Sequence, residues 1–296
     1  MIVAVGASSF AEGNETLMTY LSDHGIELRK NPYARRMTKD EIIAHLEGVE
    51  GLLAGLETLD AEVFGKCPKL RAIARIGIGM DNVDQEAAKT YGIKVSNTPE
   101  GPTEAVAEMT VTSLLMLLHN IDAHNRDVHQ GIWKKRIGRS VSEVRVLLVG
   151  YGRIGRRVGE LLKEFGTEVM VYDKYQPDLS TVTFEEGIVR ADVISIHASG
   201  EEEIISENIF CEMKQGVIIL NSARGGLISE DGLYRALKEG KVAGFWGDSL
   251  WQEPYHGKIC EFENAILTPH ISTYTKKCRA NMEMQATKNL IRDLGL

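Results

Sequence analysis

The chain has 296 residues, of which 43% are hydrophobic and 26% are charged, and its formal net charge at pH 7 is -8. This length suits two domains of ordinary size, and the composition is that of a folded globular protein rather than a disordered one. The acidic balance argues against a nucleic-acid partner, because such a surface needs clustered Lys and Arg. It does not exclude a small anionic substrate, since a basic pocket can lie within an acidic protein.

Short apolar runs alternate with helical patterns over the first part of the chain. Strands are predicted at residues 2–5, 27–29, 51–54, 72–75 and 94–96. Helices are predicted between them, at residues 15–24, 39–46, 61–65 and 83–91. This alternation favours a parallel sheet covered by helices.

A break at Asn97-Thr-Pro-Glu-Gly-Pro102 predicts a hinge, and a long apolar helical pattern follows over residues 103–125. Further strands are predicted at residues 145–149, 168–172, 193–197, 216–220, 243–247 and 265–267, and a last helix from residue 273. We therefore expect an α/β protein of two doubly wound parallel-sheet domains, Rossmann-like or flavodoxin-like. One comprises residues 1–98 plus 274–296, and the other residues 99–273.

Neither export nor membrane insertion is predicted. The N-terminal MIVAVGASSF has no basic region before a short apolar run and is typical of a first strand, not a signal peptide. No apolar run approaches the roughly 20 residues that cross a bilayer. The cysteines form no C-x-x-C pair, so we expect free thiols in a bacterial or archaeal cytoplasm and no metal site; they are Cys67, Cys211, Cys260 and Cys278.

The strongest single motif is Gly150-Tyr151-Gly152-Arg153-Ile154-Gly155, which follows a predicted strand and precedes a helical pattern over residues 156–165. In that context G-x-G-x-x-G predicts a dinucleotide site rather than an ordinary glycine-rich turn. Its glycines would permit, in order, a tight turn, close approach of the pyrophosphate, and packing of helix on strand. The N–H groups at the start of the helix would face the phosphates.

Asp173 ends the next predicted strand and is placed to accept hydrogen bonds from the adenosine ribose hydroxyls. A 2′-phosphate there would meet a like charge, although Lys174 is adjacent. The expected cofactor is therefore NAD rather than NADP.

Three segments that each follow an apolar strand carry candidate catalytic residues. They are Asn221-Ser-Ala223-Arg224-Gly-Gly226, Gly247-Asp248-Ser-Leu-Trp-Gln-Glu253-Pro254 and Leu267-Thr-Pro-His270-Ile-Ser272. Because ligands bind at the carboxyl edge of an open parallel sheet, we expect these segments to meet there. Taken singly, each candidate has a structural alternative: a surface arginine, a solvated loop glutamate and a structural histidine.

At these residues the chain resembles the D-isomer-specific 2-hydroxyacid dehydrogenase family, over nearly its whole length. The resemblance includes the glycine motif with Asp173, and also Arg75-Ile-Gly-Ile78-Gly79-Met-Asp-Asn-Val-Asp84, Asn97-Thr-Pro99 and Ala105-Val-Ala-Glu108. Within the family the chain is most similar to the phosphoglycerate dehydrogenase catalytic core, without the C-terminal regulatory domains of some members. The resemblance implies NAD-dependent hydride transfer between nicotinamide and C2 of a small (D)-2-hydroxy/2-oxo acid.

The resemblance assigns Arg224 to the substrate and makes Glu253 and His270 the acid/base pair. A 2-oxo acid presents a carboxylate and a carbonyl oxygen that gains charge as hydride arrives, and a guanidinium offers a planar fork of donors for both. His270 would protonate the new alkoxide, or accept its proton in oxidation, while Glu253 holds the other ring nitrogen.

Further contacts are implied by the same resemblance. The backbone amides of Ile78 and Gly79 would complete carboxylate binding, and His197, Ala223 and Asp248 would lie on the cofactor side, Asp248 in a buried structural role. His197 is interpreted as a packing or cofactor-side residue, because no Glu-Pro segment partners it.

Arg75 points to an acid with a second anionic group, such as a phosphorylated or phosphonate 2-hydroxy acid (for example 3-phosphoglycerate). In phosphoglycerate dehydrogenases a matching arginine faces the substrate phosphate, but Ala54-Gly55-Leu56 stands where a second arginine would be. Lys134, Lys135 and Arg136 are either replacement cations or a solvated charge run.

Two other functions stay open. The same scaffold could act on another donor such as phosphite, whereas Glu253 disfavours formate, for which the family uses glutamine. Alternatively, the chain could be an NAD(H)-sensing binding module, like the corepressors related to this family. The apolar stretch of residues 105–118 has more hydrophobic surface than one domain needs, so we expect a homodimer.

Overall fold

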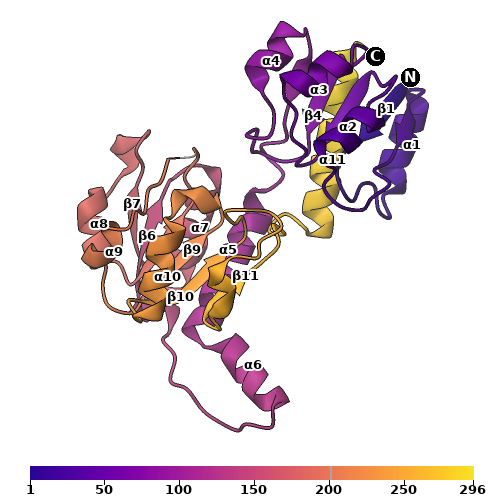
Figure 1. The fold of residues 1–296 in the computed structure, drawn as a ribbon. Helices are drawn as coiled ribbons and strands as arrows, with labels where there is room; N and C mark the ends of the chain where they lie inside the picture. The colour runs from indigo at the N-terminus through magenta and orange to yellow at the C-terminus, as the bar shows by residue number, and fades with distance from the viewer. Residues whose placement is uncertain (201) are drawn as a thin grey trace. The chain divides into compact units, whose positions relative to one another are not determined.

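The computed structural model describes residues 1–200 and 202–296 and divides into two compact units (Figure 1). The first comprises Met1–Pro102 with Tyr274–Leu296, and the second comprises Thr103–Thr273. Each unit contains its own parallel sheet with flanking helices. The predicted α/β fold class is thus confirmed.

The first unit is built on a five-stranded sheet in the order β2-β1-β3-β4-β5, with every neighbouring pair parallel. Its strands are β1 (Ile2–Val5), β2 (Glu27–Arg29), β3 (Gly51–Ala54), β4 (Ala72–Arg75) and β5 (Lys94–Ser96). Its helices are α1 (Glu15–Asp23), α2 (Lys39–His45), α3 (Ala61–Lys66), α4 (Gln85–Thr90) and α11 (Lys276–Leu294). The yellow α11 of Figure 1 packs on β3, β4 and β5, so the end of the chain completes the unit that its beginning forms.

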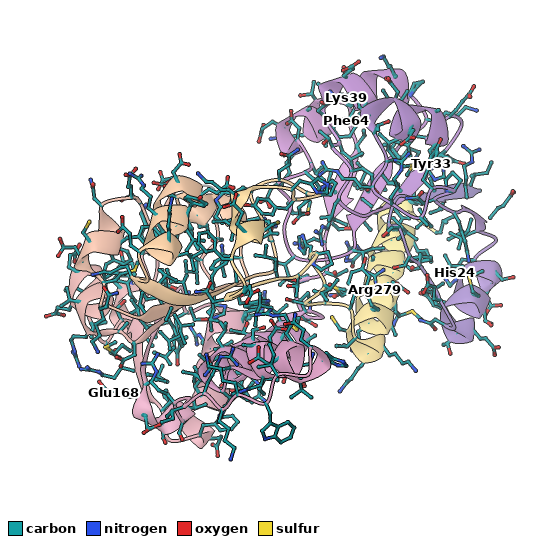
Figure 2. All side chains as sticks on the ribbon, turned by 60° about the horizontal axis from the view of Figure 1, so that its bottom comes forward. His24, Tyr33, Lys39, Phe64, Glu168 and Arg279 are labelled. Atoms are coloured by element: carbon teal, nitrogen blue, oxygen red, sulfur yellow. The ribbon has the colours of Figure 1, made fainter. Side chains whose placement is uncertain are left out.

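The central strands of this sheet are covered on both faces. All residues of β3 and β4 are buried, which is why they appear in the sequence as continuous apolar runs. Leu52 and Ile73 join a core that includes Phe64 of α3, labelled in Figure 2, whereas Leu290 of α11 lies against Gly51.

The second unit is built on a six-stranded parallel sheet in the order β11-β10-β9-β8-β6-β7. Its strands are β6 (Arg145–Val149), β7 (Glu168–Tyr172), β8 (Val193–Ile196), β9 (Val217–Asn221), β10 (Val242–Gly247) and β11 (Ala265–Leu267). Its helices are α5 (Thr103–Leu118), α6 (Ile121–His129), α7 (Arg153–Glu164), α8 (Phe184–Arg190), α9 (Ile209–Glu212) and α10 (Glu230–Lys238). The strand order reverses beside β6, and such a switch point is where open α/β sheets bind ligands.

The prediction of one helix over residues 103–125 is wrong. The chain forms α5 and α6, separated at Asn120, which has a left-handed backbone with φ of 53°. Asn tolerates that conformation better than most residues. The returning chain also closes the end of α5, because the Arg139 N–H donates to the Leu118 carbonyl at 3.0 Å. Helical periodicity alone did not reveal this tertiary contact.

Two other helices begin at residues that differ from those the apolar pattern suggests. The helix α7 starts directly after Gly152, earlier than the predicted residue 156. The last helix starts at Lys276 rather than at residue 273, because the Thr275 side chain accepts a hydrogen bond from the Cys278 N–H.

Across residues 1–200 and 202–296, no helix has both the length and the apolar character that spanning a bilayer requires. All four cysteines are free thiols.

Candidate active site

The glycine loop leaves the carboxyl end of β6 and turns sharply into α7. Gly150 has a φ of 93°, and a Cβ there would lie 2.6 Å from the Ala198 nitrogen, so only glycine fits. A Cβ on Gly155 would lie 2.2 Å from the Gly150 carbonyl oxygen, which explains the close packing of helix on strand. Both constraints agree with the roles predicted for these glycines.

The start of α7 is open to a ligand. In the described residues no side chain caps this helix, whose N-cap is Gly152. A Cβ on Gly152 would meet nothing within 4 Å, so the loop leaves space at that point. The first N–H groups of a helix, here those of Arg153 and Ile154, have no partner within it and favour an anion. A pyrophosphate fits this geometry and charge.

Asp173 follows β7 and is hydrogen-bonded to the glycine loop. Its carboxylate accepts hydrogen bonds from the N–H groups of Tyr151 at 2.7 Å and of Tyr175 and Gln176 at 2.9 Å. Burial opposes ionisation of the carboxyl group, but these three donors outweigh it and keep the pKa of Asp173 below its usual value. An ionised carboxylate has about four acceptor positions, so one is left for a ribose hydroxyl.

The loop after β9 presents Arg224. The buried Asn221 side chain accepts from the Ala223 N–H at 3.0 Å and donates to the Arg224 carbonyl at 2.8 Å, which closes a tight turn. A Cβ on Gly225 would lie 2.4 Å from the backbone of Leu250, so this loop packs directly on the loop that carries Glu253.

Glu253 and His270 form a pair. His270 Nδ1 lies 3.0 Å from one carboxylate oxygen of Glu253 and 3.3 Å from the other. Burial acts to raise the pKa of Glu253, but the hydrogen bond and charge of His270, with help from Ser249, lower it overall. Because an ionised carboxylate only accepts hydrogen bonds, Nδ1 carries the proton and Nε2 is left for a reacting group.

The backbone of His270 is held in an uncommon conformation by Asp248. His270 has a left-handed φ of 56°, which persists only when its surroundings enforce it. The buried Asp248 carboxylate accepts from the N–H groups of Ile271 and Ser272, both at 2.9 Å, and from the Thr268 hydroxyl at 2.6 Å. The Asp248 carbonyl also accepts from the His270 N–H at 2.8 Å. Asp248 is therefore a positioning residue for His270, and its predicted cofactor contact stays a prediction.

Sequence reasoning missed the side chains that support these loops. Trp246 Nε1 donates to Thr268 at 3.1 Å, which continues the chain of hydrogen bonds to Asp248. Trp251 donates to the Ile228 carbonyl at 2.7 Å and Tyr255 donates to Glu230 at 2.6 Å, so two anchored aromatic rings flank Glu253. The aromatic residues around the Glu-Pro segment were the only available signal.

In the first unit, the residues predicted to bind substrate follow β4. Thr98 and Asn97 hold this loop, since Thr98 accepts from the Gly77 N–H at 2.7 Å and Asn97 donates to the Ile78 carbonyl at 2.7 Å. In the described part of the chain, the N–H groups of Ile78 and Gly79 donate to no protein acceptor. Two adjacent amides in this state are suited to a carboxylate.

Arg75 and Glu57 are buried charged groups of this same unit. Arg75 is 7% exposed and its Nη1 donates to the Ile76 carbonyl at 2.6 Å. Glu57 is 1% exposed, and its carboxylate accepts from the Gly55 N–H at 2.8 Å. Burial raises the pKa of Glu57, although Arg36 and Arg75 favour the ionised form. Sequence reasoning did not identify Glu57.

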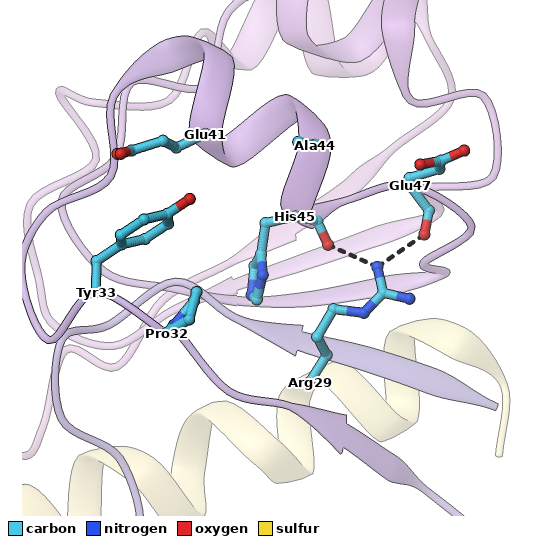
Figure 3. Close-up of a pocket in the computed structure, with 7 residues that line it drawn as sticks. All are labelled: Arg29, Pro32, Tyr33, Glu41, Ala44, His45 and Glu47. Atoms are coloured by element: carbon cyan, nitrogen blue, oxygen red, sulfur yellow. Dashed lines mark hydrogen bonds between the residues drawn. The ribbon is translucent and has the colours of Figure 1, made fainter.

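The first unit also contains an open cavity of about 510 Å³ (Figure 3). Its lining residues are Arg29, Pro32, Tyr33, Glu41, Ala44, His45 and Glu47. Arg29 is engaged by the carbonyls of His45 and Glu47, both at 2.8 Å. Glu41 is paired with Arg35. None of the predicted site residues lines this cavity, and we assign it no role.

Comparison with known proteins identifies the family. Residues 111–272 match the family model described as D-isomer specific 2-hydroxyacid dehydrogenase, NAD binding domain. The chain belongs to the D-isomer-specific 2-hydroxyacid dehydrogenase family. It is 31% identical over 293 residues to a D-3-phosphoglycerate dehydrogenase of Archaeoglobus fulgidus, covering 94% of this chain and 55% of that protein. It is 33% identical over 270 residues to a hydroxypyruvate reductase of Blautia hydrogenotrophica, covering 85% and 84%.

A solved structure shares the fold over nearly the whole chain. The TT0316 protein from Thermus thermophilus superposes with a TM-score of 0.90 at 29% identity, over 99% of this chain and 97% of that one. The chain spans about half the length of the phosphoglycerate dehydrogenases that it matches. Family membership therefore establishes the NAD-binding domain, while the substrate and the roles of single residues are proposals.

Proposed function

We propose that this protein is an NAD-dependent dehydrogenase that transfers a hydride between nicotinamide and C2 of a small 2-hydroxy/2-oxo acid. The observation that carries this proposal is the Glu253–His270 pair, whose free imidazole nitrogen belongs to the same loop cluster as Arg224. An acid/base pair and a guanidinium beside a dinucleotide-binding loop are what reduction of a 2-oxo acid needs.

The cofactor would be held by the second unit. The open loop at Gly152 and the N–H groups at the start of α7 suit the pyrophosphate, and Asp173 suits the ribose. When bound, NADH supplies the hydride. The adjacent Lys174 is paired with Glu202 at 2.9 Å, so its charge is partly balanced and should not attract a 2′-phosphate strongly.

The residues of the chain would divide the remaining work. Arg224 binds the carboxylate of the acid and stabilises charge on its C2 oxygen. His270 Nε2 donates a proton to that oxygen in reduction and takes it back in oxidation. Glu253 accepts from Nδ1–H, which fixes the tautomer and the orientation of the ring.

The test is the loss of NADH absorbance with purified full-length protein and a panel of 2-oxo acids. We expect turnover of at least one acid, and a loss of roughly 10²-fold or more in kcat for His270→Ala with NADH binding retained. Tight NADH binding without turnover of any acid would favour a sensing module instead. Formation of NADH from NAD⁺ and phosphite, without turnover of any 2-oxo acid, would favour the other donor.

We further propose that the preferred acid carries a second anionic group, bound by Arg75. Relatives of similar identity include phosphoglycerate dehydrogenases and reductases of hydroxypyruvate and glyoxylate, and these names do not distinguish between anionic and neutral-tailed acids. The buried guanidinium of Arg75 is what favours an anionic group. The test compares kcat/KM for 3-phosphohydroxypyruvate, phosphonopyruvate and pyruvate. Arg75→Ala should reduce the values for the anionic acids selectively, and Glu57→Gln, which removes a neighbouring negative charge, should raise them. Equal use of pyruvate would contradict the proposal.

We also propose that the protein is a homodimer, but not through the helix on which that prediction was based. The helix α5 packs on α7, β9 and β10 within its own unit. By contrast, α6 has no buried residue. With the loop of residues 130–140 that follows, it extends away from the sheet of its unit (Figure 1). Trp133 is 84% exposed and Ile137 fully exposed on this segment, and a second copy would cover them. Arg136 is paired with Asp127 within it.

A further inference from the structure

The imidazole of His197 lies between two serine hydroxyls at the carboxyl ends of β8 and β9. Its Nε2 is 2.8 Å from Ser195 Oγ, and its Nδ1 is 2.8 Å from Ser222 Oγ. Ser222 Oγ in turn lies 3.3 Å from the Ile196 carbonyl oxygen. Neither ring nitrogen is therefore left for a reacting group.

The available donors and acceptors determine which way each hydrogen bond in this series runs. A carbonyl oxygen only accepts, so the Ser222 hydroxyl proton goes to Ile196 and Ser222 must accept from Nδ1–H. Nε2 then bears the lone pair and accepts from the Ser195 hydroxyl. The opposite tautomer would leave the Ser195 proton without an acceptor among the described residues. Burial lowers the pKa of His197 to about 3, so the ring stays neutral and keeps a single N–H.

Through Ser222, this series of hydrogen bonds reaches the loop that presents Arg224. Ser222 precedes Ala223 and Arg224, whose backbone groups are otherwise held by Asn221 of the same turn. The bond from His197 ties the turn to a different strand. The His197 N–H also donates to the Val149 carbonyl at 2.8 Å, immediately before the glycine loop. One residue thus contacts both the nucleotide loop and the arginine loop.

We infer that His197 is a positioning residue, which holds Arg224 in place through its Nδ1–H bond to Ser222 and takes no part in proton transfer. This inference rests on the proposed function for its effect on turnover. Its structural content, that the bond from Nδ1 restrains residues 222–224, is independent of any substrate.

Two amide variants distinguish the roles of the two ring nitrogens of His197. The amide nitrogen of Asn occupies nearly the place of Nδ1, so His197→Asn retains a donor for Ser222 and loses the acceptor for Ser195. His197→Gln places its amide near Nε2 and leaves Ser222 without a donor. His197→Phe removes both bonds and retains a ring.

The first readout is hydrogen–deuterium exchange of the full-length chain, measured by mass spectrometry. Peptides covering residues 221–226 should exchange faster in His197→Phe, His197→Gln and Ser222→Ala, and at nearly the wild-type rate in His197→Asn. The matched control is His45→Asn, because His45 is the buried histidine of the other unit and should leave these peptides unchanged. Equal exchange in the Asn and Phe variants would overturn the inference.

The second readout is kinetic. His197→Phe and Ser222→Ala should each reduce kcat/KM for the 2-oxo acid roughly tenfold, as expected for loss of one buried hydrogen bond, while the dissociation constant for NADH changes less. Adding Ser222→Ala to His197→Phe should cost little more, since both remove the same interaction. Additive losses, or an equal effect on NADH binding, would show that His197 acts on the glycine loop instead. A wild-type protein that reduces no acid would refute the proposed function, while the exchange result would still decide the role of His197.

Discussion

Replacing Asp248 with Asn should weaken the hydrogen bonds that hold the loop of His270 in place. One Asp248 oxygen accepts from Thr268 and Ile271, and the other accepts from Ser272. An asparagine oxygen can retain the first two bonds, but its amide group would face the Ser272 N–H, donor against donor. A hydrogen bond to a charged group contributes about 1.5–3 kcal/mol, so a comparable loss in the free energy of unfolding is expected.

The same change should reduce turnover. The left-handed conformation of His270 costs roughly 1–2 kcal/mol. Asp248 holds this conformation by accepting from the N–H groups of His270 and Ile271. If the loop relaxes, Nδ1 no longer meets Glu253 and Nε2 moves from the reacting oxygen. We expect kcat to fall about tenfold or more, within the roughly 10²–10⁴-fold that acid–base catalysis contributes.

The assay compares the urea midpoint of unfolding, the dissociation constant for NADH and kcat for Asp248→Asn. The matched control is Asp192→Asn, because Asp192 accepts from the Arg145 N–H and pairs with Lys214 before β8, away from these loops. The control should lower stability and leave kcat near the wild-type value. A destabilised Asp248→Asn protein with wild-type kcat would show that Asp248 does not position His270.

Three further predictions concern pH, cofactor choice and assembly. The pKa of Glu253 is lowered against its burial by His270, so the stability from this pair is present above the unfolded carboxyl pKa and is lost as pH falls through the lowered value. Glu253→Gln should remove that loss of stability on the acid side, and an unchanged dependence of the unfolding free energy on pH in the variant would contradict the pairing. NADH should be preferred to NADPH by at least about tenfold in kcat/KM. Asp173→Asn should reduce this preference and raise KM for NADH, because Asp173 also accepts from the Tyr151 N–H. Steady-state kinetics with both cofactors test this, and equal use of the two cofactors by the wild type would contradict it. Trp133→Ser with Ile137→Ser should convert a dimer into monomers in sedimentation velocity, whereas Phe165→Ser, at an exposed residue of the same unit, should not; a monomeric wild type would refute the dimer.

Local sequence patterns were sufficient for most of the fold. Buried strands such as β3 and β4 appear as apolar runs because both of their faces are covered, and this signal needs no knowledge of what covers them. The glycine motif was equally clear, because the close backbone contacts of any strand–turn–helix of this kind leave no room for a Cβ at Gly150 and Gly155. The order of Arg224, Glu253 and His270 behind successive strands then placed them at one sheet edge.

Contacts between distant segments could not be predicted in this way. The end of α5 is closed by Arg139, His270 is held by Asp248, and His197 joins Ser195 to Ser222. Each of these bonds depends on where two loops meet in space, and neither partner carries a periodic or spacing signal for the other. Sequence alone therefore determined which residues follow which strand, whereas the tertiary structure decided which side chains hold them in place, because hydrogen bonds between loops depend on geometry that no local pattern records.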